Sequence, residues 1–156
     1  MSRILIFGGV FLIIVFIVRN MNKIKDFINP VVGKITSPFG ERVNPDTKQK
    51  SFHNGVDIAI KEGSDVKAPF DSIVRKIFTN ERGGLQIFLS HPKKGIATGY
   101  AHLLKSFVKE GEKIKQGFIF ALSGKDKNDI SGHLHLTLTN SEGKKINPES
   151  IFTFKT

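Results

Sequence analysis

The sequence predicts a mainly β fold, an antiparallel β-sandwich or open barrel, preceded by an N-terminal hydrophobic helix. Short segments rich in β-branched or aromatic residues alternate with glycine-containing turns through most of the chain. No window in this region shows a sustained helical period, which argues against a helical domain. The helix is predicted from one unbroken apolar run of 15 residues, Ile4 to Val18, at the start of the chain.

The expected strands follow one another at short spacing, as in all-β sandwiches and barrels. They cover residues 65–67, 72–78, 85–90, 97–102, 118–122 and 133–139. Glycine-containing turns separate them at 62–64, 82–84, 93–95, 110–112 and 142–144. Only residues 103–107 suggest a helical turn.

A chain of 156 residues has room for one ordinary domain and a short appendage. We expect a signal-anchor or transmembrane helix over residues 1–20, a polar linker with an Asn29-Pro30 turn over 21–34, and the domain over 35–156. The apolar run is about 22 Å long as a helix, short of a bilayer core of about 30 Å. It is therefore either a short membrane anchor, with Arg3 and Arg19 reaching to the interfaces, or the core of a cleavable signal.

No small-x-small cleavage site follows the run, which favours a retained anchor. The basic residues that follow it, among them Arg19 and Lys23, favour a cytoplasmic domain by the positive-inside rule. We overrule that bias because the function inferred below requires the domain to lie outside the cytoplasm, in the cell envelope. If the segment is cleaved, the protein is secreted.

Composition limits the chemistry that is available. The chain has no cysteine, so a metal site has to use histidine and carboxylate ligands. A net charge of +10 favours a polyanionic neighbour such as nucleic acid, anionic lipid or an anionic envelope. Nucleic acid is not expected as a partner, because the lysines are dispersed among acidic residues and no aromatic-and-basic stacking motif is present.

The histidines carry the strongest functional signal. In a strand over residues 133–139, alternation places His133 and His135 on one polar face and the leucines on the core face. One imidazole can bind a metal while the other exchanges protons. His53 and Asp57, four residues apart, add further ligands of the kinds that zinc accepts. Three protein ligands with an open fourth position are typical of a catalytic zinc site.

These residues belong to a longer series of motifs. In order, they are 37–42 (SPFGER), 53–59 (HNGVDIA), 63–69 (GSDVKAP), 98–103 (TGYAHL), 108–117 (VKEGEKIKQG), 132–135 (GHLH) and 147–148 (NP). The series resembles the lysostaphin/LytM-type zinc endopeptidases of bacterial cell walls over roughly residues 35–152.

The resemblance implies a zinc ion held by His53, Asp57 and His135, with water as the fourth ligand. It implies that His102 and His133 lie beside that water as general base and oxyanion stabiliser. His91 is interpreted as structural or substrate-adjacent. Tyr100 shares the side of His102 if the strand alternates regularly, so it either borders the groove or packs within the sheet.

Two functions follow from the resemblance. The first is a zinc endopeptidase that cuts cross-links or stem peptides of peptidoglycan. The second is an inactive module that binds the wall or regulates another wall hydrolase. The presence of all five metal and proton-carrying residues favours the enzyme, since inactive relatives typically lack ligands. A likeness of residues 66–69 and 108–120 to biotinyl- and lipoyl-carrier domains is interpreted as shared β architecture, because no Met-flanked lysine is present.

Overall fold

The computed structural model describes residues 27–43, 48–125 and 132–154, which form an antiparallel β structure with one short 3-10 helix. The strands are β1 (Lys34–Ser37), β2 (Gly40–Val43), β3 (Lys50–His53), β4 (Val56–Ala59), β5 (Asp65–Lys67), β6 (Ser72–Asn80), β7 (Gly84–His91), β8 (Ile96–Ser106), β9 (Lys113–Ile114), β10 (Ile119–Ser123), β11 (His133–Thr139) and β12 (Lys145–Ile146), and the helix is η1 (Pro148–Ser150). The expected mainly β, antiparallel fold is confirmed.

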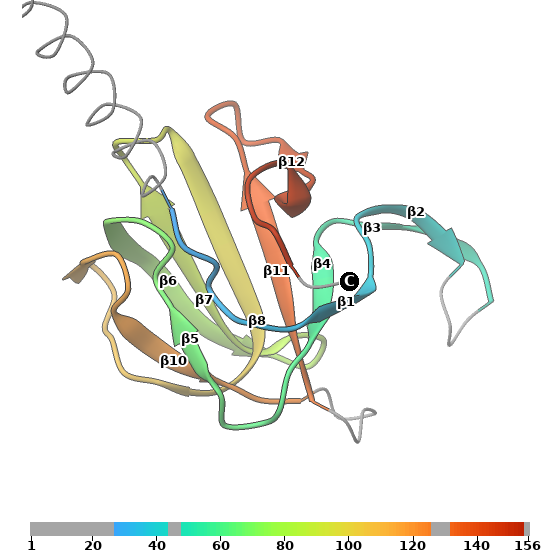
Figure 1. The fold of residues 1–156 in the computed structure, drawn as a ribbon, viewed down its shortest axis with the longest axis horizontal. Coiled ribbons are helices and arrows are strands. Elements are labelled where there is room, and N and C mark those ends of the chain that lie inside the picture. Colours follow the sequence, from blue (N-terminus) through green and yellow to red (C-terminus); the bar gives the residue numbers. More distant parts are fainter. Residues whose placement is uncertain (1–26, 44–47, 126–131, 155–156) are drawn as a thin grey trace, which may run out of the picture.

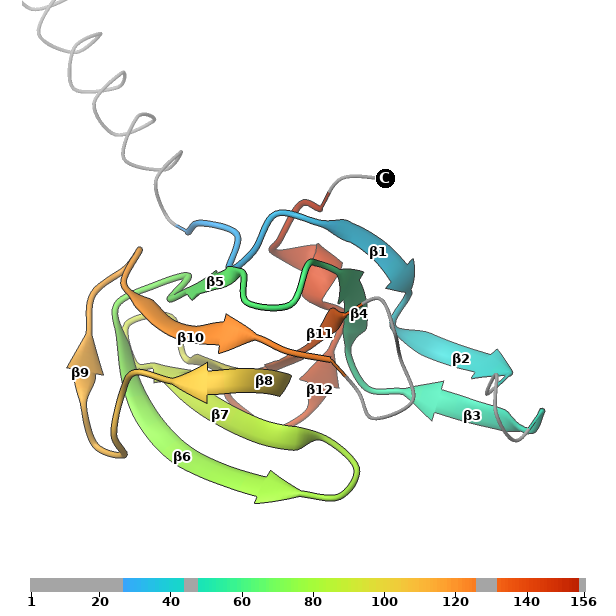
Figure 2. The same ribbon diagram turned by 90° about the horizontal axis from the view of Figure 1, so that it is seen from below.

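One large sheet carries most of the structure. Its strands run in the order β1-β4-β11-β8-β7-β6-β9, while β10 bridges β5 and β8, and β12 pairs with β11. Figures 1 and 2 show β5 and β10 lying over the curved sheet, and the β2–β3 hairpin projecting to one side. The projecting hairpin leads straight into β4, the second strand from the β1 edge, so its end lies next to the pair formed by β4 and β11.

Hydrophobic side chains that alternate along the strands form the core between these layers. On β11, Leu134, Leu136 and Leu138 are completely buried, as the alternation predicted. On β4, Val56 and Ile58 are completely buried beside them. The opposite face of both strands is left for polar side chains.

Strand β8 contains a β-bulge that changes which residues face the core. Between Tyr100 and Leu103 it has one residue more than the facing segment of β7, where Ile87 and Leu85 are their partners. His102 lies in this bulge with a φ of 59°, a left-handed conformation that is uncommon for residues other than glycine. Beyond the bulge, β8 pairs with β10, whereas before it β8 pairs with β11.

This change of partner explains one wrong prediction. Residues 103–107 were expected to form a helical turn, but β8 extends through Ser106. Lys105 and Ser106 pair with Leu122 and Ala121 of β10, so their backbone groups are hydrogen-bonded in the sheet. A helical turn would forfeit those hydrogen bonds.

The chain before β1 also differs from expectation. Residues 27–33 fall within the predicted linker, yet they pack on the domain. The Phe27 ring contacts those of Phe70 and Phe152, and Val31 is only 4% exposed. The Lys67 backbone N–H donates to the Pro30 carbonyl at 2.8 Å. Residues 27–33 of the predicted linker therefore pack against the domain.

The predicted N-terminal helix over residues 1–20 lies outside the described residues. Among the residues that the structure does describe, no helix is long and apolar enough to cross a membrane.

His91 occupies a closed polar network inside the core. It is fully buried; its Nδ1 is 3.0 Å from Ser72 Oγ, and its Nε2 is 2.8 Å from Thr98 Oγ1. Ser72 Oγ donates to the Phe70 carbonyl, so it accepts from His91 Nδ1. Burial lowers the pKa of His91 from 6.5 to about 4, because a charged imidazolium is poorly solvated there.

We expect this histidine to make the fold sensitive to acid. Between pH 6.5 and 4 the unfolded chain binds a proton at His91 that the folded chain does not bind, so the free energy of unfolding falls as the pH is lowered. The loss is up to about 3 kcal/mol. Urea unfolding of the wild type and of His91→Gln across this range measures it. A pH slope equally steep in both proteins would contradict the assignment.

Candidate metal centre

Three ligand atoms converge on the polar face of β4 and β11. Asp57 lies in β4 directly opposite His135 in β11, and His53 ends β3. His135 Nδ1 is 2.7 Å from Asp57 Oδ1 and 3.1 Å from His53 Nε2, and His53 Nε2 is 3.3 Å from Asp57 Oδ1. The three residues expected to hold the metal are thus brought together.

Each ligand histidine makes a hydrogen bond through the ring nitrogen that faces away from Asp57, and this bond orients the ring. His53 Nδ1 is 2.8 Å from the Pro38 carbonyl oxygen, and His135 Nε2 is 3.2 Å from Asn54 Oδ1. Both oxygens can only accept, so each of these ring nitrogens donates. In neutral rings, His53 Nε2 and His135 Nδ1 then present lone pairs toward the Asp57 carboxylate. Three such electron-rich atoms need a positive charge between them.

The spacing of these atoms fits a zinc ion. Zinc lies about 2.0–2.2 Å from nitrogen and oxygen ligands, so the corners of its tetrahedron are about 3.3–3.5 Å apart. The three separations approach that spacing, with the Asp57–His135 pair somewhat closer. Two imidazoles and one carboxylate form a donor set that suits zinc. The residues present therefore fit the ion that the sequence predicted.

The Asp57 carboxylate has a different neighbour on each oxygen. Arg42 Nη1 is 3.4 Å from Oδ2, while Oδ1 faces the two histidines. Burial opposes ionisation of Asp57, but hydrogen bonds and positive charge from His135 and His53, which act when those rings are protonated, outweigh it and hold the pKa of the carboxyl well below its usual range. Asp57 is therefore an anion in the folded protein, and Arg42 leaves Oδ1 as the oxygen available to a cation.

Gly55 makes the approach of β11 possible. A Cβ atom there would lie 2.3 Å from the Leu136 carbonyl oxygen and 2.9 Å from the His135 ring. Any side chain at this position would displace the β11 backbone or the His135 ring. The glycine in the His53–Asp57 interval is thus part of the site.

His102 and His133 stand beside the three ligands. Their ring centroids are 4.6 Å apart, and the His102 ring lies 6.4 Å from the His135 ring. The bulge in β8 is what turns His102 to this face, since Ala101, opposite His135, already faces the same way. Two backbone hydrogen bonds of 2.8 Å fix the bulge, from His102 N–H to the Gly83 carbonyl and from Gly124 N–H to the His102 carbonyl.

Tyr100 and His91 lie elsewhere. Tyr100 is 1% exposed and hydrogen-bonds Thr98 Oγ1 through its hydroxyl group, and its ring packs on Phe120. Regular alternation would have put Tyr100 on the side of His102, but the extra residue of the bulge places them on opposite faces. His91 belongs to the same buried network. Neither side chain borders the metal centre; both are structural.

Sequence reasoning missed the residues that support the ligands. Arg42 also donates to Ser37 Oγ, which lies 3.4 Å from His53 Nδ1, so one guanidinium links two ligands. Arg42 and Ser37 lie in the opening motif SPFGER, and Asn54 follows the first ligand. Their nearness to the ligands in sequence was the available signal. The Pro38 carbonyl is a backbone group, so its contact with His53 leaves no signal in the sequence.

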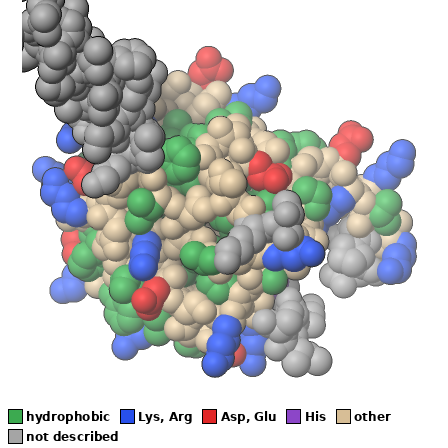
Figure 3. Space-filling view, in the orientation of Figure 1, with side chains coloured by type: hydrophobic (Ala, Val, Ile, Leu, Met, Phe, Trp, Pro, Cys, Tyr) green, Lys and Arg blue, Asp and Glu red, His purple; other side chains and the backbone are tan. Residues whose placement is uncertain are grey.

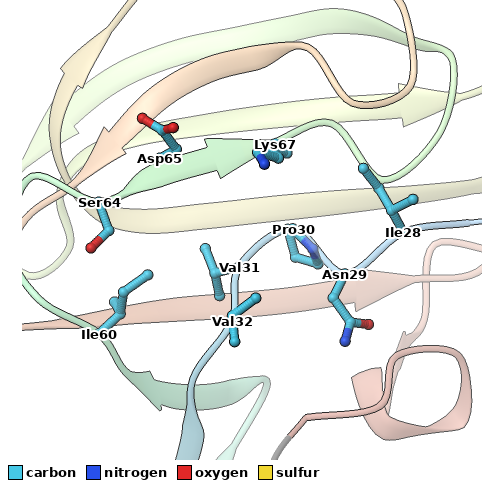
Figure 4. A pocket seen from close by; sticks show the side chains of 9 residues that line it. All are labelled: Ile28, Asn29, Pro30, Val31, Val32, Ile60, Ser64, Asp65 and Lys67. Carbon is cyan, nitrogen blue, oxygen red and sulfur yellow. The ribbon is translucent and has the colours of Figure 1, made fainter.

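A separate hollow lies away from the metal centre. Figure 4 shows it between the segment before β1, including Pro30 and Val31, and β5, which contributes Asp65 and Lys67 to its lining. No histidine lines it. On the face of the molecule seen in Figure 3, basic and acidic side chains are interspersed and no histidine is visible.

Comparison with known proteins agrees with this geometry. The family model described as Peptidase family M23 matches residues 51–148. A peptidoglycan DD-endopeptidase of Vibrio cholerae, ShyA, is 32% identical over 115 residues, which are 73% of this chain and 26% of that protein. The chain spans only 25% to 32% of the length of the first curated relatives that it matches.

Solved structures share the fold. A zinc-containing peptidase from Vibrio cholerae superposes with a TM-score of 0.68 at 27% identity, covering 79% of this chain and 38% of that one. The catalytic domain of lysostaphin from Staphylococcus simulans gives a TM-score of 0.67 at 25% identity, covering 76% and 90%. The resemblance to lysostaphin-type peptidases is confirmed.

The geometry predicts different effects for the two histidines of β11. His135→Ala removes a ligand, so zinc affinity should fall by more than about 100-fold, beyond what the loss of a supporting hydrogen bond costs. His133→Ala should keep a zinc affinity close to that of the wild type. Competition with a chelating dye measures both affinities. Equal losses in the two variants would show that the roles are wrongly assigned.

Proposed function

This chain belongs to peptidase family M23, and from that premise we propose that it is a zinc endopeptidase that hydrolyses peptide bonds of bacterial peptidoglycan. The observation that carries the proposal is the complete site: His53, Asp57 and His135 converge, with the His102–His133 pair beside them. The name of the similar protein ShyA supports peptidoglycan as the substrate, and the zinc-containing peptidase from Vibrio cholerae supports the metal.

The residues divide into those that hold the ion and those that move protons. His53, Asp57 and His135 would hold zinc, which when bound supplies a Lewis acid that acidifies water and polarises a peptide carbonyl. Of the other pair, one imidazole takes the proton of the attacking water and passes it to the leaving amine as the C–N bond breaks. The second imidazole, when protonated, stabilises the negative charge that develops on the carbonyl oxygen.

An imidazole suits this work because its ordinary pKa lies near neutrality. The bulge contributes the geometry, because it places the His102 ring against the His133 ring. An inactive wall-binding module is the other candidate from the sequence, and no feature of the site favours it, since every ligand and both proton carriers are present.

We also propose that residues 1–20 anchor the protein in the cytoplasmic membrane, with the domain outside the cytoplasm. The apolar run of Ile4 to Val18 supports an anchor, and no small-x-small cleavage site follows it. The substrate supports the orientation, because peptidoglycan lies outside the cytoplasm. The few basic residues after the run are a weak opposing signal.

The activity is tested on purified peptidoglycan. The full chain with zinc should release muropeptides in which each cut gains one water and exposes one new amine and one new carboxyl group. Mass spectrometry of the products identifies the bond. A chelator should abolish release and added zinc should restore it, because the ligand set has no function in hydrolysis without the ion. Undiminished cleavage after zinc removal would refute the mechanism.

The anchor is tested in cells that express the full chain with a C-terminal tag. The protein should remain in the membrane fraction after an alkaline carbonate wash, and a variant without residues 1–20 should not. Protease added to intact spheroplasts should degrade the tagged domain. Protection of the domain until the membrane is lysed would show the opposite orientation.

A further inference from the structure

One cation lies on the same face of the sheet as the metal ligands, farther along β11. Lys145 Nζ donates to Thr139 Oγ1 at 2.8 Å and to Thr137 Oγ1 at 3.2 Å. Both threonines alternate with the buried leucines, so they continue the row that His133 and His135 begin. The ammonium group therefore lies on the face that carries the metal ligands. It sits between Thr137 and Thr139, the next two residues of β11 on that face after His135.

The sheet beneath this lysine is shaped to receive it. Thr137 pairs with Gly99 of β8, which pairs in turn with Phe88 of β7. A Cβ atom at Gly99 would lie 2.6 Å from the Phe88 ring and 2.7 Å from Thr137 Oγ1, so only glycine leaves both in place. Lys145 Nζ lies 5.6 Å from the centre of the Phe88 ring, in a cation–π contact. These contacts hold the ammonium in one position.

The charge of Lys145 is not balanced by a carboxylate. Within the described part of the chain, the ion pairs involve other basic residues, and neither Asp nor Glu pairs with Lys145. The side chain is partly buried, and desolvation lowers its pKa. A partly buried positive charge whose hydrogen-bond partners are two neutral hydroxyl groups gains more from an added anion than a fully solvated charge does.

The position of the ammonium sets how far that anion lies from the metal ligand His135. Alternate residues of a strand are about 7 Å apart, so a group between Thr137 and Thr139 lies roughly 10 Å along β11 from His135. An extended peptide bound alongside β11 would advance about 3.3 Å per residue. We infer that Lys145 is a specificity-determining residue that binds a carboxylate of the peptide substrate about three residues from the bond that is cut. This inference rests on the proposed function and adds the substrate feature that the site selects.

The test uses two synthetic cross-linked muropeptide dimers, one with free carboxylates and one with those carboxylates converted to carboxamides. The wild-type full chain should have a kcat/KM roughly 10- to 100-fold higher for the acid dimer, as expected for a charge-assisted hydrogen bond. In Lys145→Met that preference should fall to near one. Lys145→Arg, which keeps the charge, should retain part of it and shows that the position tolerates substitution.

The matched control is Lys144→Met, which removes the same charge from the exposed neighbouring lysine and should keep the wild-type preference. A preference that persists in Lys145→Met, or that disappears equally in Lys144→Met, overturns the inference. Calorimetric binding of both dimers to the zinc-free full chain separates the two proposals. If neither dimer is cut, the proposed function fails, and the inference then stands only if the acid dimer binds more tightly to the wild type than to Lys145→Met.

Discussion

The antiparallel pairing of β4 with β11 is the constraint on which the site depends. It sets Asp57 opposite His135 on one face and buries Ile58 against Leu134 on the other. A slip of β11 by one residue would turn His135 into the core and expose three fully buried leucines, at roughly 1.5–3 kcal/mol for each. The hydrophobic core thus holds the metal ligands in register, and no contact among the ligands themselves is needed to do so.

The bulge in β8 meets a second requirement of the same face. A regular strand presents only every other residue to one face, but Ala101, which pairs with His135, and its neighbour His102, whose ring lies against that of His133, both face the metal ligands. The extra residue of the bulge allows both side chains to lie on this face. A left-handed non-glycine residue costs about 1–3 kcal/mol, and the backbone hydrogen bonds to Gly83 and Gly124 fix it in place. Local strain at His102 is therefore stabilised by the surrounding sheet.

Much of this was predictable from the sequence, because strand periodicity is local. The bounds of β5 and β11 agree with prediction, and alternation correctly separated the leucines of β11 from its histidines. The short strands β1 to β4 were not predicted, since four residues offer too few alternations to recognise. The bulge could not be predicted, because it breaks the period from which strands are inferred. For that reason Tyr100 does not share the side of His102, and of its two expected placements the packed one is observed. Support from the Pro38 carbonyl depends on a tertiary contact that side-chain identity does not encode.

Under the proposed function, the net positive charge and Lys145 act on the substrate at different steps. Basic residues spread over the surface would attract an anionic substrate from a distance, but their field is screened within about 8 Å at physiological salt. Such a field draws in polyanions without distinguishing one peptide from another. A partly buried ammonium, fixed by two threonines and a phenylalanine ring, acts only at short range and on one position of a bound peptide. Encounter with the wall therefore depends on ionic strength, whereas selection among bound peptides depends on the alignment of one carboxylate with the face that carries the metal ligands.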